Sequence, residues 1–308
     1  MLNKEKNYIS IILLLTKESR HIETWLQYML DFSKIYFEHY EFVFVDNNAS
    51  KALVDSLRAL LHNQPITANL VNLPYEVNKE QAMLAGIDAS IGDFIYEFED
   101  SMVDYPKDSL WQMYEACLIG HDFVFLQPEN YKCSWEHWFY RLVSRYSSKH
   151  TLLVKSRVHL ISRRAVNRVN QLNKVIHYRK YAYCNTGLNY TFIKYQSSVA
   201  KHKKWQLKFS TIDFATDLLL LFTNLGKLIA ILFAILFALI SILAAIYAMS
   251  AYFFLNNIVT GWTTLMLFLS ISFTGVFICF AIIIKYLGLL INNRYDNDNI
   301  IAEKQKIS

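Results

Sequence analysis

Two long apolar segments without a charged residue, 228–255 and 262–284, most constrain what this chain can fold into. Each exceeds the ~20 residues that a helix needs to cross the hydrocarbon core of a bilayer. Helices in a soluble core seldom run so far without a charge, so the segments predict a hairpin of two membrane spans. Lysines before the first segment, and Lys285 and Arg294 after the second, place both termini in the cytoplasm by the positive-inside rule.

The segment 205–225 precedes the first span and repeats apolar residues on one helical face, which predicts an amphipathic helix in the membrane interface. The chain before it is strongly basic and ends in Lys-His-Lys-Lys-Trp at 201–205. This charge has two interpretations, a topological signal or a surface for anionic substrate and lipid phosphate. A membrane-anchored chain with a net charge of only +5 argues against binding to nucleic acid.

The first 200 residues alternate short apolar runs with helical patterns. Strands are expected at 8–15, 41–45, 66–73, 94–98, 121–126 and 190–195, and helices at 21–37, 52–61, 78–90, 110–118 and 131–146. This alternation predicts an α/β fold with a mostly parallel sheet, of a nucleotide-binding type. GxGxxG and GxxxxGK[ST] are both absent from the sequence, which disfavours a dinucleotide enzyme and a P-loop NTPase. The four cysteines lack the spacing of a zinc site and fit a reducing cytosol.

Carboxylates cluster where the strand at 94–98 ends. Glu97, Glu99 and Asp100 come at this strand end, and Asp104 follows shortly after. The carboxyl edge of an open α/β sheet is where ligands bind, and clustered carboxylates there suit a divalent cation that carries phosphates. A solvated acidic turn is an equal alternative on this stretch alone.

Four motifs carry a resemblance to a known family: VDNNAS at 45–50, NKEQAMLAG at 78–86, FEDSMVDYP at 98–106 and KHKKW at 201–205. With the interfacial helix and the hairpin, they make the chain resemble family 2 glycosyltransferases of the A-type (GT-A) fold. Within that family it is similar to the polyprenyl-phosphate glycosyltransferases, the group of dolichol-phosphate mannose synthase and bactoprenol glucosyltransferase.

The resemblance implies four regions: a cytoplasmic glycosyltransferase domain at 1–200, an interfacial helix at 201–226, a transmembrane hairpin at 227–291 and a cytoplasmic tail at 292–308. It also implies a role for each motif residue. Nucleotide-sugar binding falls to Asp46, Asn47, Lys79 and Glu99; the metal, Mg²⁺ or Mn²⁺, to Glu99 and Ser101; catalysis to Glu99, Asp100, Asp104, Arg163 and Arg164; and the lipid phosphate to Lys203, Lys204 and Trp205. Because serine is a weaker ligand than a carboxylate, metal binding rests mainly on Glu99, with Asp100 or Asp104 as the alternative second ligand.

The function implied by the resemblance is transfer of a sugar from a nucleotide sugar to polyprenyl phosphate for cell-surface glycan synthesis. The transfer is expected to be one inverting displacement, assisted by a divalent cation on the leaving diphosphate. The enzyme is expected as a two-span protein of the inner (plasma) membrane, in contact with membrane lipids and assembled as a homo-oligomer. Asn47, Ser101 and Arg157 depart from the family motifs and support an alternative, a non-catalytic relative that acts as a lipid-binding or protein-binding scaffold. A small transporter is disfavoured because neither span carries an ionisable residue.

Overall fold

The chain divides into two compact units. A computed structural model describes residues 4–62, 64–129, 156–171, 186–197, 261–295 and 303–307, together with Arg179, Tyr183 and single residues between 232 and 246. The first unit comprises residues 1–141, 151–204 and 298–308, and the second comprises residues 142–150 and 205–297. The C-terminal end of the chain therefore belongs to the same unit as the N-terminal end.

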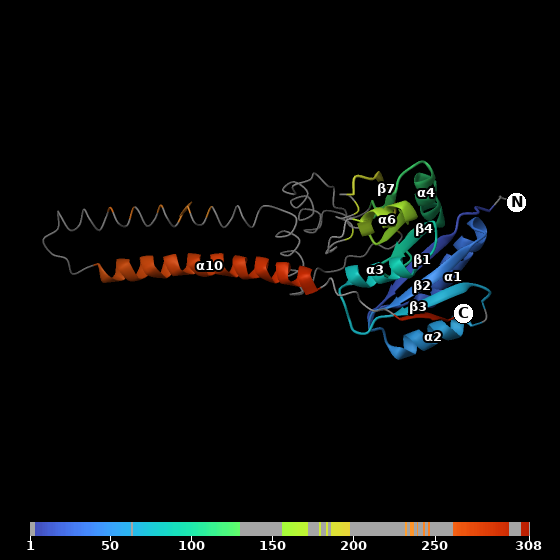
Figure 1. Cartoon of the computed structure of the whole chain (residues 1–308), viewed down its shortest axis with the longest axis horizontal. Coiled ribbons are helices and arrows are strands. Elements are labelled where there is room, and N and C mark those ends of the chain that lie inside the picture. The colour runs from blue at the N-terminus through green and yellow to red at the C-terminus, as the bar shows by residue number, and fades with distance from the viewer. Residues whose placement is uncertain are drawn as a thin grey trace. The chain divides into compact units, whose positions relative to one another are not determined.

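The first unit is built on an eight-stranded mixed sheet (Figure 1). Its strands are β1 (Ile9–Leu15), β2 (Tyr40–Asp46), β3 (Thr67–Asn72), β4 (Phe94–Phe98), β5 (Phe123–Pro128), β6 (Val158–Ser162), β7 (Tyr190–Tyr195) and β8 (Glu303–Lys306). They lie in the order β7-β5-β6-β4-β1-β2-β3-β8. Strands β1 to β4 are parallel, whereas β6 is antiparallel to β4 and β5, and β8 is antiparallel to β3.

Helices cover both faces of the sheet. Helices α1 (Ile22–Tyr36), α2 (Lys51–Leu61) and α4 (Lys107–Leu118) pack on one face, and α3 (Lys79–Ala89) and α6 (Arg163–Gln171) on the other. The cause is visible in β1, where all seven residues are buried. Ile11 and Leu13 face one apolar layer, and Ile12 and Leu14 face the other. A strand covered on both faces has no polar side, which is typical of parallel sheets.

Close packing of α3 depends on a glycine. A Cβ atom at Gly86 would lie 2.6 Å from Val45 Cγ2 and 2.8 Å from Ile12 Cγ2, so only glycine lets the helix lie this close to β1 and β2. The loop that leads into the helix is held by Asn47, whose amide donates to and accepts from the backbone of Val77, each at 2.9 Å. These contacts fix the first turn of α3 at the carboxyl edge of the sheet.

The α/β alternation expected from the sequence is confirmed, and the bounds of β4 and β7 agree with the predicted 94–98 and 190–195. The expected strand at 121–126 lies two residues later, as β5. Three elements were not expected: β6, α6 and β8. The predicted helices at 131–146 and 205–225, and all but single residues of the span at 228–255, lie outside the described residues.

The described part of the second unit is mainly one helix, α10 (Trp262–Tyr295), which includes the predicted span at 262–284. Large apolar side chains on it are exposed, among them Leu265, Phe273, Phe280 and Ile284. Within the described residues, no helix meets the combined length and hydropathy expected of a membrane span.

We expect Gly86→Val to lower the free energy of unfolding by about 1–3 kcal/mol, because the new side chain overpacks against Val45 and Ile12. Urea unfolding of the full chain in detergent, followed by tryptophan fluorescence, measures the change. Gln81→Val introduces the same side chain at a half-exposed position of the same helix and should change the value by only about 0.5 kcal/mol. Equal effects of the two substitutions would contradict the packing argument.

Candidate functional site

Three elements meet at the carboxyl edge of the sheet. Leu15, the last residue of β1, pairs with Asp46 of β2, and Phe98, the last residue of β4, pairs with Leu13 on the other side of β1. Asp46 and Glu99 therefore lie at one edge with β1 between them. The chain runs from β1 outward through β2 and β3 and then returns to β4 on the other side, which makes this edge a topological switch point, the usual ligand site of open α/β sheets.

The N-terminus of α3 supplies the third element of the edge. Asn78 caps the helix, because its Oδ1 accepts a hydrogen bond from the backbone N–H of Glu80 at 3.3 Å. Lys79, the first helical residue, is exposed. The free N–H groups of a helix N-terminus and an adjacent lysine attract a phosphate group. The first turn of α3 is thus suited to hold an anion.

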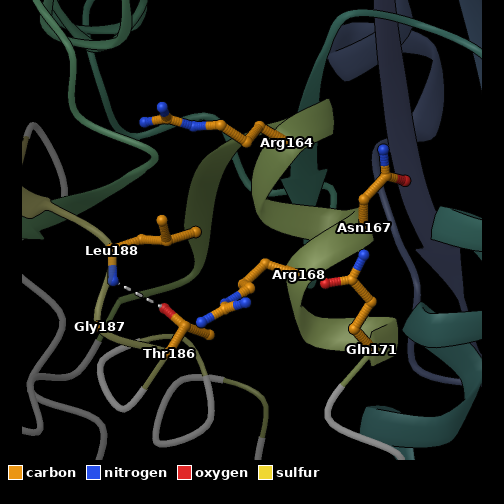
Figure 2. A pocket seen from close by; sticks show the side chains of 7 residues that line it. All are labelled: Arg164, Asn167, Arg168, Gln171, Thr186, Gly187 and Leu188. Carbon is orange, nitrogen blue, oxygen red and sulfur yellow. Dashed lines mark hydrogen bonds between the residues drawn. The ribbon is translucent and has the colours of Figure 1, made fainter.

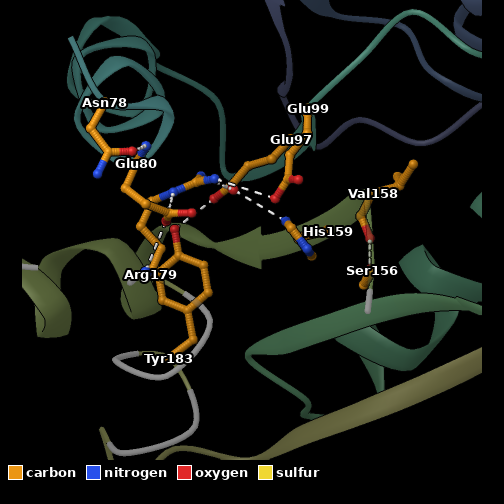
Figure 3. Close-up of polar contacts among 9 residues, drawn as sticks. All are labelled: Asn78, Glu80, Glu97, Glu99, Ser156, Val158, His159, Arg179 and Tyr183. Carbon is orange, nitrogen blue, oxygen red and sulfur yellow. Dashed lines mark hydrogen bonds and ion pairs between the residues drawn. The ribbon is translucent and has the colours of Figure 1, made fainter. Parts of the chain in front are cut away.

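A buried arginine links α3 to the end of β4 (Figure 3). The backbone N–H and Nε of Arg179 both donate to Glu80 Oε2 at 2.9 Å. One terminal nitrogen, Nη1, donates to Glu97 Oε2, and the other, Nη2, lies 3.7 Å from Glu99 Oε1. The side chain of Arg179 is only 1% exposed, so these carboxylates replace the water that a guanidinium would otherwise bind.

Glu97 is fully buried on β4 and receives three partners. Besides Arg179, the Tyr183 hydroxyl donates to Oε1 at 2.7 Å, and His159 Nδ1 lies 3.4 Å from Oε2. Burial by itself would raise the pKa of Glu97, but Arg179, followed by His159 and Tyr183, outweighs burial and lowers the pKa to about 2. Glu97 is therefore ionised at neutral pH and serves as an internal counter-ion.

A second arginine neutralises the loop after β4. Arg157 Nη1 donates to both carboxylate oxygens of Asp100, at 3.1 and 3.2 Å, and Nη2 lies 2.6 Å from Asp104 Oδ1. Asp104 is buried and also accepts from Tyr195, at 3.2 Å, and from Ser197, at 2.8 Å. Burial opposes the charged form of Arg157, yet Asp100 and Asp104 raise its pKa above the usual value.

Three of the residues expected to bind the nucleotide and the metal make contacts with the protein backbone. Asp46 Oδ1 accepts from the backbone N–H of Ala49 at 2.8 Å. The Asn47 amide is bonded in both directions to Val77. The Ser101 hydroxyl is buried and donates to the Arg20 carbonyl at 2.5 Å. Asn47 and Ser101 thus shape the loops of the edge, whereas Asp46, Lys79 and Glu99 are gathered on it.

The structure places Arg163 and Arg164 at the opposite edge of the sheet. Arg163 donates to the carbonyl of Gly92, just before β4, at 2.9 Å, and Arg164 donates to Asp122, just before β5, at 2.9 and 2.5 Å. Since β6 is antiparallel to β4, the residues that follow β6 lie where β4 begins. The expectation that these arginines act beside Glu99 is corrected by this geometry.

Arg164 lines a pocket of about 610 Å³ at that opposite edge, between α6 and the loop before β7 (Figure 2). The other lining residues are Asn167, Arg168, Gln171, Thr186, Gly187 and Leu188. The predicted lipid-phosphate residues Lys203, Lys204 and Trp205 lie outside the described residues.

The carboxylates at the end of β4 do not fit a divalent cation. Glu80 and Glu97 bind Arg179, Asp100 and Asp104 bind Arg157, and the Ser101 hydroxyl donates to a carbonyl. Among the described residues, no group of three or more His, Cys, Asp or Glu side chains has the arrangement of a metal site. The metal pair expected from the sequence, Glu99 and Ser101, is thus left with one carboxylate, which itself faces Arg179.

Sequence reasoning did not find the two arginines that organise the site. Arg157 stood out only as a departure from a motif, and its position just before the apolar run of β6 was the available signal. Arg179 belonged to a basic stretch, and its partners Glu80 and Glu97 lie 99 and 82 residues away in the chain. No local pattern could have indicated that pairing.

We expect Glu97→Gln to lower the free energy of unfolding at pH 7 by an amount on the order of 3 kcal/mol, because the folded state holds the Glu97 pKa near 2 instead of 4.5. A depressed carboxyl pKa stabilises the fold above the unfolded pKa, and this stabilisation is lost as the pH falls from 4.5 towards 2. Urea unfolding at pH 7 and pH 3 should therefore show a smaller difference between wild type and variant at pH 3. Glu38→Gln, at an exposed position, is the control, and a difference independent of pH would refute the argument.

No protein-family model matches the chain, and no curated protein sequence matches it. Solved structures are similar to it. The mannosyltransferase PcManGT from Pyrobaculum calidifontis, in complex with GDP-Man and Mn²⁺, has 13% sequence identity and a TM-score of 0.53, over 96% of this chain and 89% of that chain. Glucosyl-3-phosphoglycerate synthase from Mycobacterium tuberculosis, in complex with Mn²⁺ and UDP-Glc, has 11% identity and a TM-score of 0.46, over 70% and 77% of the two chains. The likeness to PcManGT shows that this chain has a mixed α/β sheet resembling the GT-A glycosyltransferase fold.

Proposed function

We propose that the protein is a glycosyltransferase whose nucleotide-sugar donor binds at the carboxyl edge formed by β1, β2, β4 and α3. The observation that supports this most directly is the meeting of Asp46, Lys79 and Glu99 at one topological switch point. The likeness of the fold to a mannosyltransferase solved with GDP-Man agrees with this choice of donor class.

In this proposal each edge residue has a distinct electrostatic task. Lys79 and the free N–H groups of α3 bind the diphosphate of the donor, and Asp46 accepts hydrogen bonds from the nucleoside. Glu99 borders the position of the sugar. The charge that develops on the leaving diphosphate is stabilised by Lys79 and by the guanidinium of Arg157, which are in place before the reaction begins.

The acceptor that we propose is polyprenyl phosphate. Its phosphate is already ionised at neutral pH, so an oxygen of the lipid phosphate can attack the anomeric carbon without a protein base. The bond between that carbon and the donor diphosphate breaks, and the nucleoside diphosphate leaves with the electron pair. Because attack and departure take place on opposite faces of the carbon, the anomeric configuration is inverted. Lys203, Lys204 and Trp205 are proposed to hold the lipid phosphate at the membrane surface.

We further propose that the second unit is a two-span hairpin in the inner (plasma) membrane, with both termini in the cytoplasm and the chain assembled as a homo-oligomer. The exposed apolar side chains of α10 support contact with lipid. The pairing of β8 with β3 supports the topology, because the chain returns after the second unit to the sheet from which it started. A chain that leaves and returns to the same compartment must cross the membrane an even number of times.

A non-catalytic scaffold is the second candidate. It is favoured by two sets of contacts. Arg157 occupies the carboxylates of Asp100 and Asp104, and the side chains of Asn47 and Ser101 bond to the backbone, so fewer polar groups remain for a substrate. Binding of a nucleotide sugar would separate the two functions, because a ligand that binds only the folded state stabilises it.

Membranes that contain the chain, incubated with radiolabelled nucleotide sugars and polyprenyl phosphate, should transfer label into the organic phase. Lys79→Ala should lower this transfer by about 10- to 100-fold, since one charge-assisted contact to the diphosphate contributes about 1.5–3 kcal/mol. As a control, Lys34→Ala replaces an exposed lysine in the last turn of α1 and should leave transfer unchanged. If folded and inserted protein transferred no label from any donor, the scaffold would be the better account.

The hairpin predicts opposite results for two fusions to alkaline phosphatase, which is active only outside the cytoplasm. A fusion after residue 258, between the two apolar segments, should be active, and a fusion after residue 308 should be inactive. Matched green fluorescent protein fusions, which fluoresce in the cytoplasm, should give the reverse pattern. Equal phosphatase activity at both positions would rule out the hairpin.

A further inference from the structure

We propose that Arg157 and Arg179 supply, at the end of β4, the positive charge that a divalent cation would otherwise supply, so that this protein binds its nucleoside diphosphate without Mg²⁺ or Mn²⁺. The nucleotide part of this inference rests on the proposed function. The part that concerns metal binding rests only on contacts within the described residues.

Arg157 occupies the carboxylates of the loop after β4. Its two terminal nitrogens contact both oxygens of Asp100 and Oδ1 of Asp104, and Ser197 donates to the remaining oxygen, Oδ2, of Asp104 at 2.8 Å. A Mg²⁺ ion needs oxygen ligands at about 2.0–2.1 Å in an octahedral arrangement. To enter here it would have to displace a guanidinium that is held by two carboxylates.

Arg179 lies on the other side of the site, where buried ion pairs hold it. It is buried to 1% exposure and is bound by Glu80 and Glu97, with Glu99 at 3.7 Å. Removing it would leave carboxylates buried without a counter-charge, which costs several kcal/mol. Glu99 also faces this guanidinium, so a positive group already lies where a cation on Glu99 would have to bind.

A guanidinium can replace the electrostatic part of the cation's role. Arginine stays charged at all physiological pH values, and its planar N–H donors match phosphate oxygens. The side chain of Arg157 is 25% exposed, so its guanidinium is partly open to the edge where the donor diphosphate would lie. Asp100 and Asp104 hold the guanidinium of Arg157 in place, in the role that they would otherwise have toward a metal ion.

Titration of the full-length protein in detergent with Mn²⁺, followed by the electron paramagnetic resonance signal of the free ion, tests the metal part directly. We expect the wild type to leave the free signal unchanged up to about 1 mM, because one or two available carboxylate oxygens bind weakly. Arg157→Gln releases Asp100 and Asp104 and should gain a Mn²⁺ site with at least tenfold tighter binding. Arg164→Gln also releases a buried aspartate, Asp122, but at the opposite edge. Among the described residues Arg164 is paired with this one carboxylate, so the variant should gain no Mn²⁺ site.

Two results would overturn the proposal. One is micromolar Mn²⁺ binding by the wild type that Asp100→Asn abolishes. The other is a folded Arg157→Gln variant that gains no Mn²⁺ binding, since the guanidinium would then not be what fills the site. If Arg157→Gln fails to fold, the wild-type titration, with Asp100→Asn as its reference, still decides.

The nucleotide part is tested by thermal unfolding of the wild type with UDP or GDP. Stabilisation should be equal in EDTA and in Mn²⁺, and stabilisation that requires Mn²⁺ would refute the inference. If neither nucleotide stabilises the protein under any condition, the proposed function fails instead, while the Mn²⁺ titration still decides whether arginine has taken the place of the cation.

Discussion

The contact of Arg179 with Glu80 and Glu97 holds the candidate site together. It ties the first turn of α3 to β4 across an apolar layer, and it provides the charge without which Glu97 could not be buried. An ion pair of this kind adds little net stability compared with a well-packed apolar core, but it fixes geometry, because losing either partner leaves a buried charge. The relative position of helix and strand, and so the shape of the edge, depends on it.

Those parts of the fold that rest on local pattern could be predicted from the sequence. β1 and β4 consist mainly of apolar residues and are followed by polar ones, and α1 repeats its apolar residues at helical spacing, so each is recognisable alone. β6 was missed because it carries His159 in its middle and follows Arg157, and its buried character depends on Glu97 across the sheet. β8 has four exposed polar residues and no apolar period, so nothing in its sequence distinguishes it from a solvated tail.

The site residues that lie at the ends of regular elements could likewise be predicted from the sequence. Asp46 ends β2, Lys79 begins α3 and Glu99 directly follows β4, so parallel topology alone brings them to one edge. Arg163 and Arg164 were assigned to the catalytic site by the resemblance, and a single antiparallel strand, β6, places them at the opposite edge of the sheet. Pairings such as that of Arg157 with Asp104 depend on tertiary contacts and leave no periodic signal in the sequence.

The position of β8 at the edge of the sheet also determines when the sheet can be completed during synthesis. The edge of β3 pairs with residues 303–306, which leave the ribosome only after the second unit has been made. Until then the open edge of β3 presents unpaired backbone groups, which favour pairing with another chain. Completion of the sheet is thus a late event of synthesis, and a nascent chain that stalls within the second unit would carry an unprotected strand.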